Sequence, residues 1–445
     1  MTNMNMLKIP GSAIVQSAVM LFGVLLAGES IGAQPLQGSA AQPASSYALD
    51  IGIGRSDNLT RVPFNEVAEN IATAGLQFSL DRAGSRLNAE MDGNLRYFDY
   101  LDNTYDNELT GRFDGTVAFG IVPERLNWVV EDSYGQSLID VFAVPTPSNR
   151  EGINFFSTGP DLLFNFGANG FARLFGRYAA TSYEVTPLDG NRRQVGLSAG
   201  RRLAGSGALS LNLVGERLVY DNSLLNPGYD REQVFVRYET RGARTRVSLD
   251  AGYTRITDLA YTNGGASVQL DVSRSVSASS RLVFSGGVRI TDSSDRFRMA
   301  EIGAISGAQT SVISATPEVF ENRFARIGWE FSRNRTSLGL SASFNDDVYE
   351  RSTTLGRTRT IAEFNFRRQL TRAFSARVLG SYTNEKHDAV NADFSEWRAG
   401  LGFRVTLGRS VFVNLEGDRY KRTADDAARE YSENRAFLTL GVESR

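Results

Sequence analysis

The chain has 445 residues, no cysteine and a formal net charge of -2, with 48 basic and 50 acidic side chains. The absence of cysteine excludes disulfides and cysteine-ligated metals, and the near-neutral balance gives no electrostatic reason to expect nucleic-acid binding. Lysine occurs only at Lys8, Lys386 and Lys421, so arginine, whose guanidinium pairs well with carboxylates, supplies the other positive charges.

Residues 1–33 are typical of a secretory signal peptide. Lys8 precedes an apolar stretch, Ala13–Ala27, and the small pair Gly32-Ala33 offers a cleavage site, with cleavage after Ala27 as the alternative. Residues 34–45 are then expected to form a short periplasmic segment, and residues 46–445 the folded part. No later run approaches the roughly 18 apolar residues of a membrane-spanning helix.

From about residue 46 onwards, the sequence repeats runs of roughly ten residues in which apolar and polar side chains alternate. The run Arg244–Thr254 is the clearest case, with apolar side chains at Val247, Leu249, Ala251 and Tyr253 and polar ones at Arg246, Ser248, Asp250 and Thr254. A period of two places the two sets on opposite faces of a strand. One face suits lipid and the other carries ionised groups that need water, which predicts an outer-membrane β-barrel with a wet interior.

Tight turns and longer loops alternate between these runs. The expected turns are Asp81–Ser85, Ile121–Glu124, Gly167–Gly170, Leu203–Gly207, Arg241–Ala243, Ser275–Ser279, Arg333–Arg335, Leu370–Arg372 and Gly408–Arg409. The expected loops include Asp57–Glu69, Gln136–Asn149, Tyr220–Tyr229, Ser293–Val319, Asp346–Thr354, Glu385–Phe394 and Thr423–Tyr431. Short periplasmic turns and long outer loops are typical of such barrels. We therefore predict an all-β chain: a single transmembrane antiparallel up-and-down β-barrel of about 20 strands, or 18 if weak runs merge, with a water-filled or loop-plugged lumen.

The polar faces of the strands carry charged side chains along the whole barrel. An unpaired buried ion costs several kcal/mol, so these groups require a hydrated interior. They either line a transport path or form a solvated ion-pair ladder that only holds the wall in shape. The lumen-facing candidates are Arg96, Arg112, Asp114, Arg173, Arg177, Arg237, Glu239, Arg246, Asp250, Arg289, Arg326, Glu330, Arg398 and Arg404.

Two of the expected loops have an unusual composition for extracellular segments. Gln136–Asn149 contains the apolar and proline residues Val141, Phe142, Pro145 and Pro147. This loop either folds into the lumen and narrows the pore, or packs as a cap on the rim. Ser293–Val319 is long and rich in small residues, which fits a folded lid or plug.

The sequence offers little for catalysis. His387 is the only histidine, and Ser381 lies on the same predicted strand, but their spacing is not specific for a nucleophile and its base. An exposed histidine in a polar loop is the favoured interpretation. With a single histidine and no cysteine, and no calcium-loop spacing among the carboxylates, we predict no enzyme, no metal site and no cofactor.

Two segments carry a resemblance to a known family. The first is the strand Ile51–Leu59, which ends in the pair Asp57-Asn58, and the second runs through Glu131–Gln136 and on to Phe156–Pro160. Together with the hairpin pattern they resemble the β-barrel porins encoded in exopolysaccharide operons. The resemblance implies an outer-membrane conduit for a surface polysaccharide with a periplasmic export partner. The chain departs from most outer-membrane barrels in ending Gly441–Arg445, where the assembly machinery usually reads an aromatic residue.

We therefore expect a protein of the Gram-negative outer membrane that contacts its lipid, the barrel-assembly machinery and a polysaccharide. Export of the polysaccharide is the first expectation. A general or substrate-selective porin for small solutes, a barrel enzyme and a structural or adhesin barrel are the alternatives. Because arginine and acidic residues interleave along the strands, the sequence does not indicate the charge of the polymer.

Overall fold

The computed structural model describes residues 44–203, 205–224, 226–258, 262–299, 315–389 and 391–444. The expected signal peptide and residues 34–43 lie outside this part of the chain, and β1 begins at Ala44 rather than at residue 46. The strands are β1 (Ala44–Ser56), β2 (Glu69–Ala83), β3 (Leu87–Tyr100), β4 (Glu108–Val122), β5 (Leu126–Leu138), β6 (Arg150–Phe166), β7 (Gly170–Tyr183), β8 (Gly190–Arg202), β9 (Gly207–Tyr220), β10 (Tyr229–Arg241), β11 (Thr245–Thr257), β12 (Thr262–Ser277), β13 (Ser280–Thr291), β14 (Phe320–Arg333), β15 (Thr336–Tyr349), β16 (Arg357–Gln369), β17 (Phe374–His387), β18 (Phe394–Leu407), β19 (Val411–Ala424) and β20 (Tyr431–Glu443). The helical elements are η2 (Pro147–Asn149), α2 (Ser293–Met299), η3 (Thr353–Leu355) and η4 (Ala427–Arg429).

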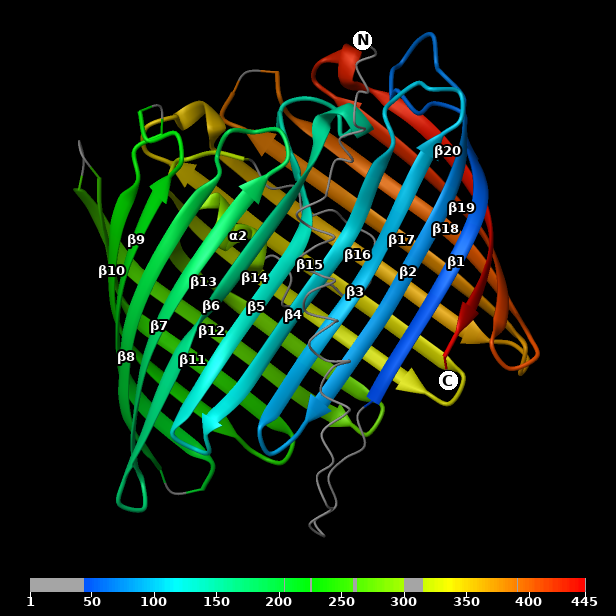
Figure 1. Cartoon of the computed structure of the whole chain (residues 1–445). Helices are drawn as coiled ribbons and strands as arrows, with labels where there is room; N and C mark the ends of the chain where they lie inside the picture. Colours follow the sequence, from blue (N-terminus) through cyan, green and yellow to red (C-terminus); the bar gives the residue numbers. More distant parts are fainter. Residues whose placement is uncertain are drawn as a thin grey trace, which may run out of the picture.

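The strands form one closed sheet. Within the described residues the sheet has 20 strands, and each strand pairs antiparallel with its neighbours in the sequence (Figure 1). β1 also pairs with β20, from Ala48 opposite Glu443 to Ser56 opposite Arg435. This pairing leaves the sheet without an edge. A closed sheet gives the backbone N–H and C=O groups of its strands hydrogen-bond partners where the membrane offers no water. The predicted fold class is confirmed, with 20 strands rather than 18.

The connections at the two ends of the barrel differ in length. One end has short turns such as 334–335, where Asn334 adopts a left-handed φ of 53°. The other end has longer connections, including the loop 139–149 and the connection between β13 and β14, of which residues 292–299 and 315–319 are described. β5 extends to Leu138, so the first of these loops is shorter than predicted, and the second contains the unpredicted helix α2. Short turns face the periplasm in barrels of this kind, so both strand termini of the sheet, at Ala44 and Glu443, lie on that side.

The outer face of the barrel is apolar. Ile51, Val195, Ile327 and Leu401, on four strands spread around the barrel, are each more than half exposed. Extensive apolar exposure of this kind marks a surface that is covered by another apolar phase. Partly exposed aromatic side chains lie near the loop ends of several strands, as in the girdle at a membrane interface: Tyr97, Tyr178, Tyr253, Tyr382 and Trp397. Strands of 12 to 17 residues exceed the roughly 9–11 residues that cross a bilayer. The protein is a multi-strand β-barrel of the bacterial outer membrane.

None of the helices within the described residues has the length and hydrophobicity of a membrane-spanning segment.

Candidate functional site

The candidate site is the bore of the barrel, whose inner face follows from the strand register. Residues directly opposite each other in an antiparallel register lie on the same face of the sheet. Arg192 and Arg231 contact Asp295 of α2 inside the barrel, and Glu216 pairs with both arginines. The register extends this inner face from strand to strand. It places on the inner face all the predicted lumen residues: Arg96, Arg112, Asp114, Arg173, Arg177, Arg237, Glu239, Arg246, Asp250, Arg289, Arg326, Glu330, Arg398 and Arg404.

Many of these arginines pair with carboxylates on neighbouring strands. Asp161 accepts from both Arg173 and Arg177 at 2.8 Å, and Arg237 donates to Asp250 at 2.6 Å. Further inner-face pairs are Arg96–Asp50 (3.1 Å), Arg112–Asp114, Arg398–Asp418 (2.9 Å) and Arg404–Glu443 (2.5 Å). The pairs of Asp161, Arg237 and Arg398 join adjacent strands, whereas Arg96–Asp50 and Arg404–Glu443 reach across an intervening strand and Arg112–Asp114 lies within β4. Arg246, Arg289 and Arg326 have no carboxylate partner among the described residues, and the guanidinium of Arg289 lies 4.4 Å from the ring centroid of Phe324.

Aromatic rings on the inner face lie against glycines of the adjacent strands. A Cβ atom added at Gly196 would lie 2.2 Å from the ring of Phe175, and one at Gly200 would lie 2.7 Å from the ring of Phe171. Because the glycines leave this space free, the rings lie along the wall instead of projecting into the bore. The guanidinium of Arg173 stacks on Phe175 at 5.0 Å from the ring centroid, so the same wall presents ring faces and cations.

A cavity of about 540 Å³ lies over this part of the wall. Phe171, Arg173 and Arg237 line it together with the polar side chains of Ser198 and Asn212. Ser198 donates a hydrogen bond to the side-chain oxygen of Asn212 at 2.5 Å. The bore therefore offers flat apolar surfaces beside guanidinium, amide and hydroxyl groups, which together can contact both the ring faces and the hydroxyls of a sugar.

The loop between β13 and β14 enters the bore through α2, which Figure 1 places inside the ring of strands. The guanidinium of Arg192 contacts Asp292 at 2.7 Å and Asp295 at 3.0 Å, and Arg231 contacts Asp295 at 2.5 Å. Glu216 completes this buried cluster by accepting from Arg192 at 2.7 Å and Arg231 at 2.8 Å. All five side chains are at most 7% exposed.

The same helix also contacts distant parts of the wall. Phe297 packs with Ile153 and Phe155 of β6, and Arg296 donates to the side chain of Asn345 in β15 at 2.8 Å. Helix α2 therefore bridges the walls around β6, β8–β10 and β15. It obstructs the bore in this structure.

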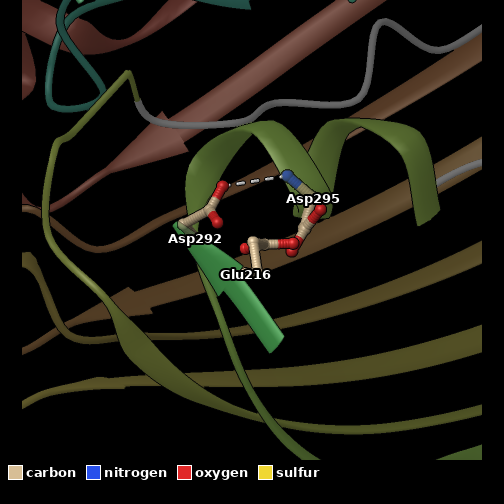
Figure 2. Close-up of side chains that lie close together, drawn as sticks. All are labelled: Glu216, Asp292 and Asp295. Carbon is tan, nitrogen blue, oxygen red and sulfur yellow. Dashed lines mark hydrogen bonds between the residues drawn. The ribbon is translucent and has the colours of Figure 1, made fainter. Parts of the chain in front are cut away.

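The carboxylates of Glu216, Asp292 and Asp295 converge, as Figure 2 shows, with the backbone N–H of Asp295 donating to Asp292 at 3.0 Å. Their oxygens are close enough to hold a metal ion. Arg192 and Arg231 already supply the compensating charge, so a divalent cation would have to share the site with two guanidinium groups. The cluster is a salt-bridge anchor for α2, and it gives no support for a metal site.

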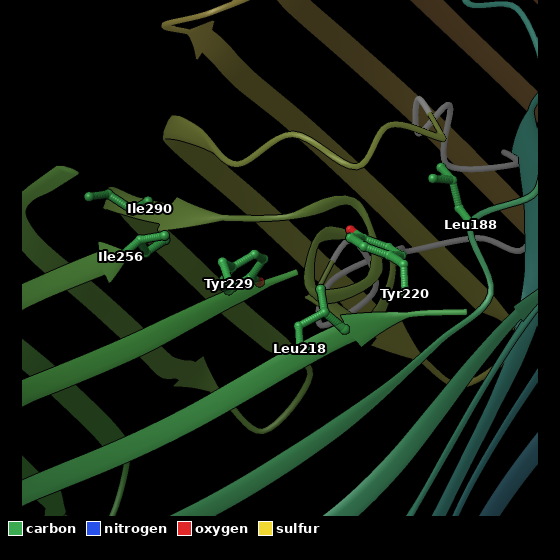
Figure 3. Packing of buried hydrophobic residues seen from close by; sticks show 6 residues of the cluster. All are labelled: Leu188, Leu218, Tyr220, Tyr229, Ile256 and Ile290. Atoms are coloured by element: carbon green, nitrogen blue, oxygen red, sulfur yellow. The ribbon is translucent and has the colours of Figure 1, made fainter. Parts of the chain in front are cut away.

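An apolar layer lies beside this anchor, at the loop ends of β9 to β13. Leu218, Tyr220, Tyr229 and Ile256 are buried together with Leu188 and Ile290 (Figure 3). Ala315 and Val319, from the returning part of the β13–β14 loop, pack against it. The hydroxyl of Tyr229 donates to Asp292, which joins the apolar layer to the charged cluster. Burial of this apolar surface adds to the attachment of the loop.

The loop 139–149 crosses the mouth of the barrel. The ring of Phe142 lies 5.3 Å from that of His387 at the end of β17, and the carbonyl oxygen of Pro145 accepts a hydrogen bond from Arg61 at 2.9 Å. Val141 and Pro147 are buried. Because the loop leaves from β5 and returns to β6, contact with β17 requires it to extend inward over the opening.

His387 is not exposed, contrary to the interpretation from sequence. Its side chain has an exposed fraction of zero, and its Nε2 lies 3.0 Å from Glu385. The loop 139–149 covers it through Phe142. Ser381 lies six positions away along β17, which is about 20 Å at 3.3 Å per residue. The structure therefore does not bring these two residues together as a nucleophile and a base.

The anchor residues Arg192, Glu216 and Arg231 were not among the predicted lumen residues. Each lies on an inner face of an alternating run, which is the only signal that the sequence carries. Their partners Asp292 and Asp295 belong to a segment that lies roughly a hundred residues after Arg192 in the sequence. Alternation within strands does not indicate where such a loop lies.

The anchor should withstand moderate acid. Burial opposes ionisation of Asp292 and Asp295, but Arg192 and the other guanidiniums outweigh it and hold the pKa of both carboxyls below the usual value. A lowered pKa means that the attachment is fully present above the ordinary carboxyl pKa of about 3.9 and is lost only as the pH falls through the lowered value. We expect the conductance of the reconstituted barrel to stay constant from about pH 8 to pH 4 and to rise in stronger acid. Opening between pH 5 and pH 7 in planar bilayers would contradict this assignment.

The sequence matches no family model, and it matches no curated protein. Among solved structures, it is similar to a mutant of the ferric enterobactin receptor PfeA from Pseudomonas aeruginosa, with 10% identity, a TM-score of 0.46 and coverage of 91% of this chain and 81% of that one. It is also similar to OccK2 (OpdF) of Pseudomonas aeruginosa, with 11% identity, a TM-score of 0.36 and coverage of 92% and 99%. A third is the FrpB iron transporter of Neisseria meningitidis (F3-3 variant), with 10% identity, a TM-score of 0.41 and coverage of 90% and 82%.

Proposed function

We propose that the protein is an outer-membrane conduit through which a surface polysaccharide leaves the cell. The observation that carries the proposal is the inner wall over β7 to β10, where Phe171 and Phe175 lie against glycines and beside guanidinium groups. Flat rings let a sugar chain stack and slide, since each contact is similar to the next. Arginines that are already paired with carboxylates can donate hydrogen bonds to the sugar, and no single one of them binds the polymer strongly enough to hold it in place.

The two inward loops support a conduit that is closed at rest. The loop 139–149 covers the mouth and α2 obstructs the bore below it. A bore wide enough for a polymer would otherwise leak small solutes, so a closed resting state is useful for an exporter. The periplasmic export partner implied by the resemblance belongs to this proposal, as the component that would deliver the polymer.

A substrate-selective porin for small solutes is the second candidate. The observation that favours it is α2 itself, because a helix held across the bore by several walls leaves narrow passages rather than a wide channel. Steady ion current through the purified barrel in planar bilayers would favour the porin. A barrel that stays mostly closed would favour the exporter.

The proposal is tested in the producing cell. Deletion of the gene is expected to abolish surface polysaccharide and leave polymer in the periplasm, measured by fractionation and sugar analysis. Complementation with the double variant Phe171→Ala/Phe175→Ala should restore the barrel but not normal export, because the stacking surface is gone. The control is Phe344→Ala/Phe364→Ala, which removes two rings from the outer face, and it should restore export. Normal surface polysaccharide in the deletion strain would defeat the proposal.

A further inference from the structure

We propose that the periplasmic entrance contains an anion-binding pocket that takes the acidic sugar units of the exported polymer, such as uronates. A cavity of about 300 Å³ lies at the short-turn end, next to the turns that follow β14 and β16. Arg335, Arg367, Arg372 and Arg404 line it. The inference rests on the proposed export function and adds the chemical class of the substrate.

The pocket carries an excess of positive charge. Glu443 is the one carboxylate among its described lining residues, and it already accepts from Arg404 at 2.5 Å. Arg335, Arg367 and Arg372 have no carboxylate partner in the described part of the chain. Each of these three residues is exposed to solvent, so each can bind an anion without breaking an existing ion pair.

The strand register concentrates this charge on the inner face. Arg367 lies directly opposite Arg377 on the adjacent strand, an arrangement of like charges that is unfavourable for the sheet by itself. Arg377 does not line the pocket and donates to Asn365 at 3.2 Å, but an anion bound at Arg367 would offset this repulsion. Arg404 is held in place by Glu443 and by stacking on Phe412, 3.7 Å from the ring centroid.

Polar groups beside the guanidiniums complete the pocket. Ser337, Ser375 and Thr406 contribute hydroxyl groups to its lining. The side chain of Gln369 donates to the carbonyl oxygen of Arg372 at 3.1 Å and holds the turn. Guanidinium groups bind carboxylates through two parallel hydrogen bonds. The hydroxyl groups of the lining can form hydrogen bonds with the neighbouring oxygens of the sugar.

The charge of the two barrel ends favours entry of a polyanion from the periplasm. Short turns around the rim carry further arginines, including Arg86, Arg125, Arg244 and Arg409. The loops at the other end are mainly acidic, with residues such as Asp57, Asp106, Asp221, Asp258 and Asp388. Positive potential at an opening raises the local concentration of an anionic ligand. Because Arg367 and Arg404 lie on the inner face, the phosphates of the surrounding lipid do not satisfy them.

The test is calorimetric titration of the purified barrel in neutral detergent with tetragalacturonate and with uncharged maltotetraose. The pocket lies on the periplasmic side of α2, so binding does not require an open bore. The variant Arg335→Gln/Arg367→Gln/Arg372→Gln should lower the affinity for tetragalacturonate by about tenfold or more, as expected for lost charge-assisted hydrogen bonds. The matched control, Arg86→Gln/Arg125→Gln/Arg244→Gln, removes the same charge elsewhere on the rim and should stay within about threefold of the parent protein because salt screens distant charges.

The outcomes separate this inference from the proposed function. Equal losses in the two triple variants would overturn it in favour of overall rim charge, and equal binding of maltotetraose would overturn it while leaving a polysaccharide conduit intact. Stronger, pocket-dependent binding of a short-chain phosphatidylglycerol than of tetragalacturonate would overturn it in favour of a lipid site. Binding of neither tetrasaccharide would overturn it and would also count against export.

Discussion

Replacing Arg192 by alanine should release α2 and raise the conductance of the reconstituted barrel several-fold. Arg192 contacts Glu216, Asp292 and Asp295 in the buried cluster. Without it, these three carboxylates depend mainly on Arg231 for compensation. Removing one partner from a buried ion pair costs about 3–5 kcal/mol, and the barrel can avoid that cost by letting the loop move into water. Single-channel recording in planar bilayers measures the effect.

A chemical probe reports the position of α2 independently of current. Ile153 is fully buried beside Phe297, and the chain has no cysteine, so Ile153→Cys should react slowly with a thiol reagent in the parent protein and rapidly in the Arg192→Ala background. Phe297→Ala should act in the same direction without leaving an unpaired charge. The control is Arg217→Ala, because the Arg217–Asp230 pair is 71% and 56% exposed and exposed pairs contribute little. Unchanged conductance and labelling in both the Arg192→Ala and the Phe297→Ala variant would contradict the assignment of α2 as an obstruction of the bore.

Replacing Gly111 by alanine should strongly impair assembly of the barrel, although it adds only one methyl group. Gly111 lies within β4 at a φ of 115°. A residue with a Cβ atom adopts a positive φ only at a conformational cost of roughly 1–2 kcal/mol. A Cβ atom there would also lie 2.0 Å from the carbonyl oxygen of Asn94 on β3, so the two strands would have to separate locally. Loss of hydrogen bonds between strands is costly in a membrane because no water replaces them.

The measurement is the fraction of protein that migrates as a folded barrel on unheated gels, together with the urea concentration at half unfolding. Gly215→Ala is the matched control, since a methyl group added there would have no atom within 4 Å and its backbone does not adopt a positive φ. This control should assemble like the parent protein. Equal assembly of the two variants would show that the Gly111 conformation is not required.

How far the sequence could predict this barrel depends on the range of the interactions. Alternation such as that of Val247, Leu249 and Ala251 determines which side chains share a face of a strand, because the period of two is a property of the extended backbone itself. Turn composition marks where each strand ends. These local signals were enough for the all-β barrel and for the inner-face positions of residues such as Arg237 and Arg398. They left 18 strands open beside 20, and the structure decides for 20 within the described residues.

The anchor of α2 and the pocket at the periplasmic entrance needed the tertiary structure. Asp292 reaches Arg192 only because the loop folds back into the bore. Arg335 and Arg404 line the same pocket only because two turns and β18 lie side by side at the rim. The sequence also left His387 as an exposed residue, whereas Phe142 from another loop covers it. Alternation and turn composition were therefore sufficient to predict the strands, their two faces and the barrel class, since backbone period and turn chemistry are local. The obstruction of the bore and the accumulation of charge at the rim emerge from the folded chain alone, because they depend on contacts between segments with no fixed spacing along the sequence.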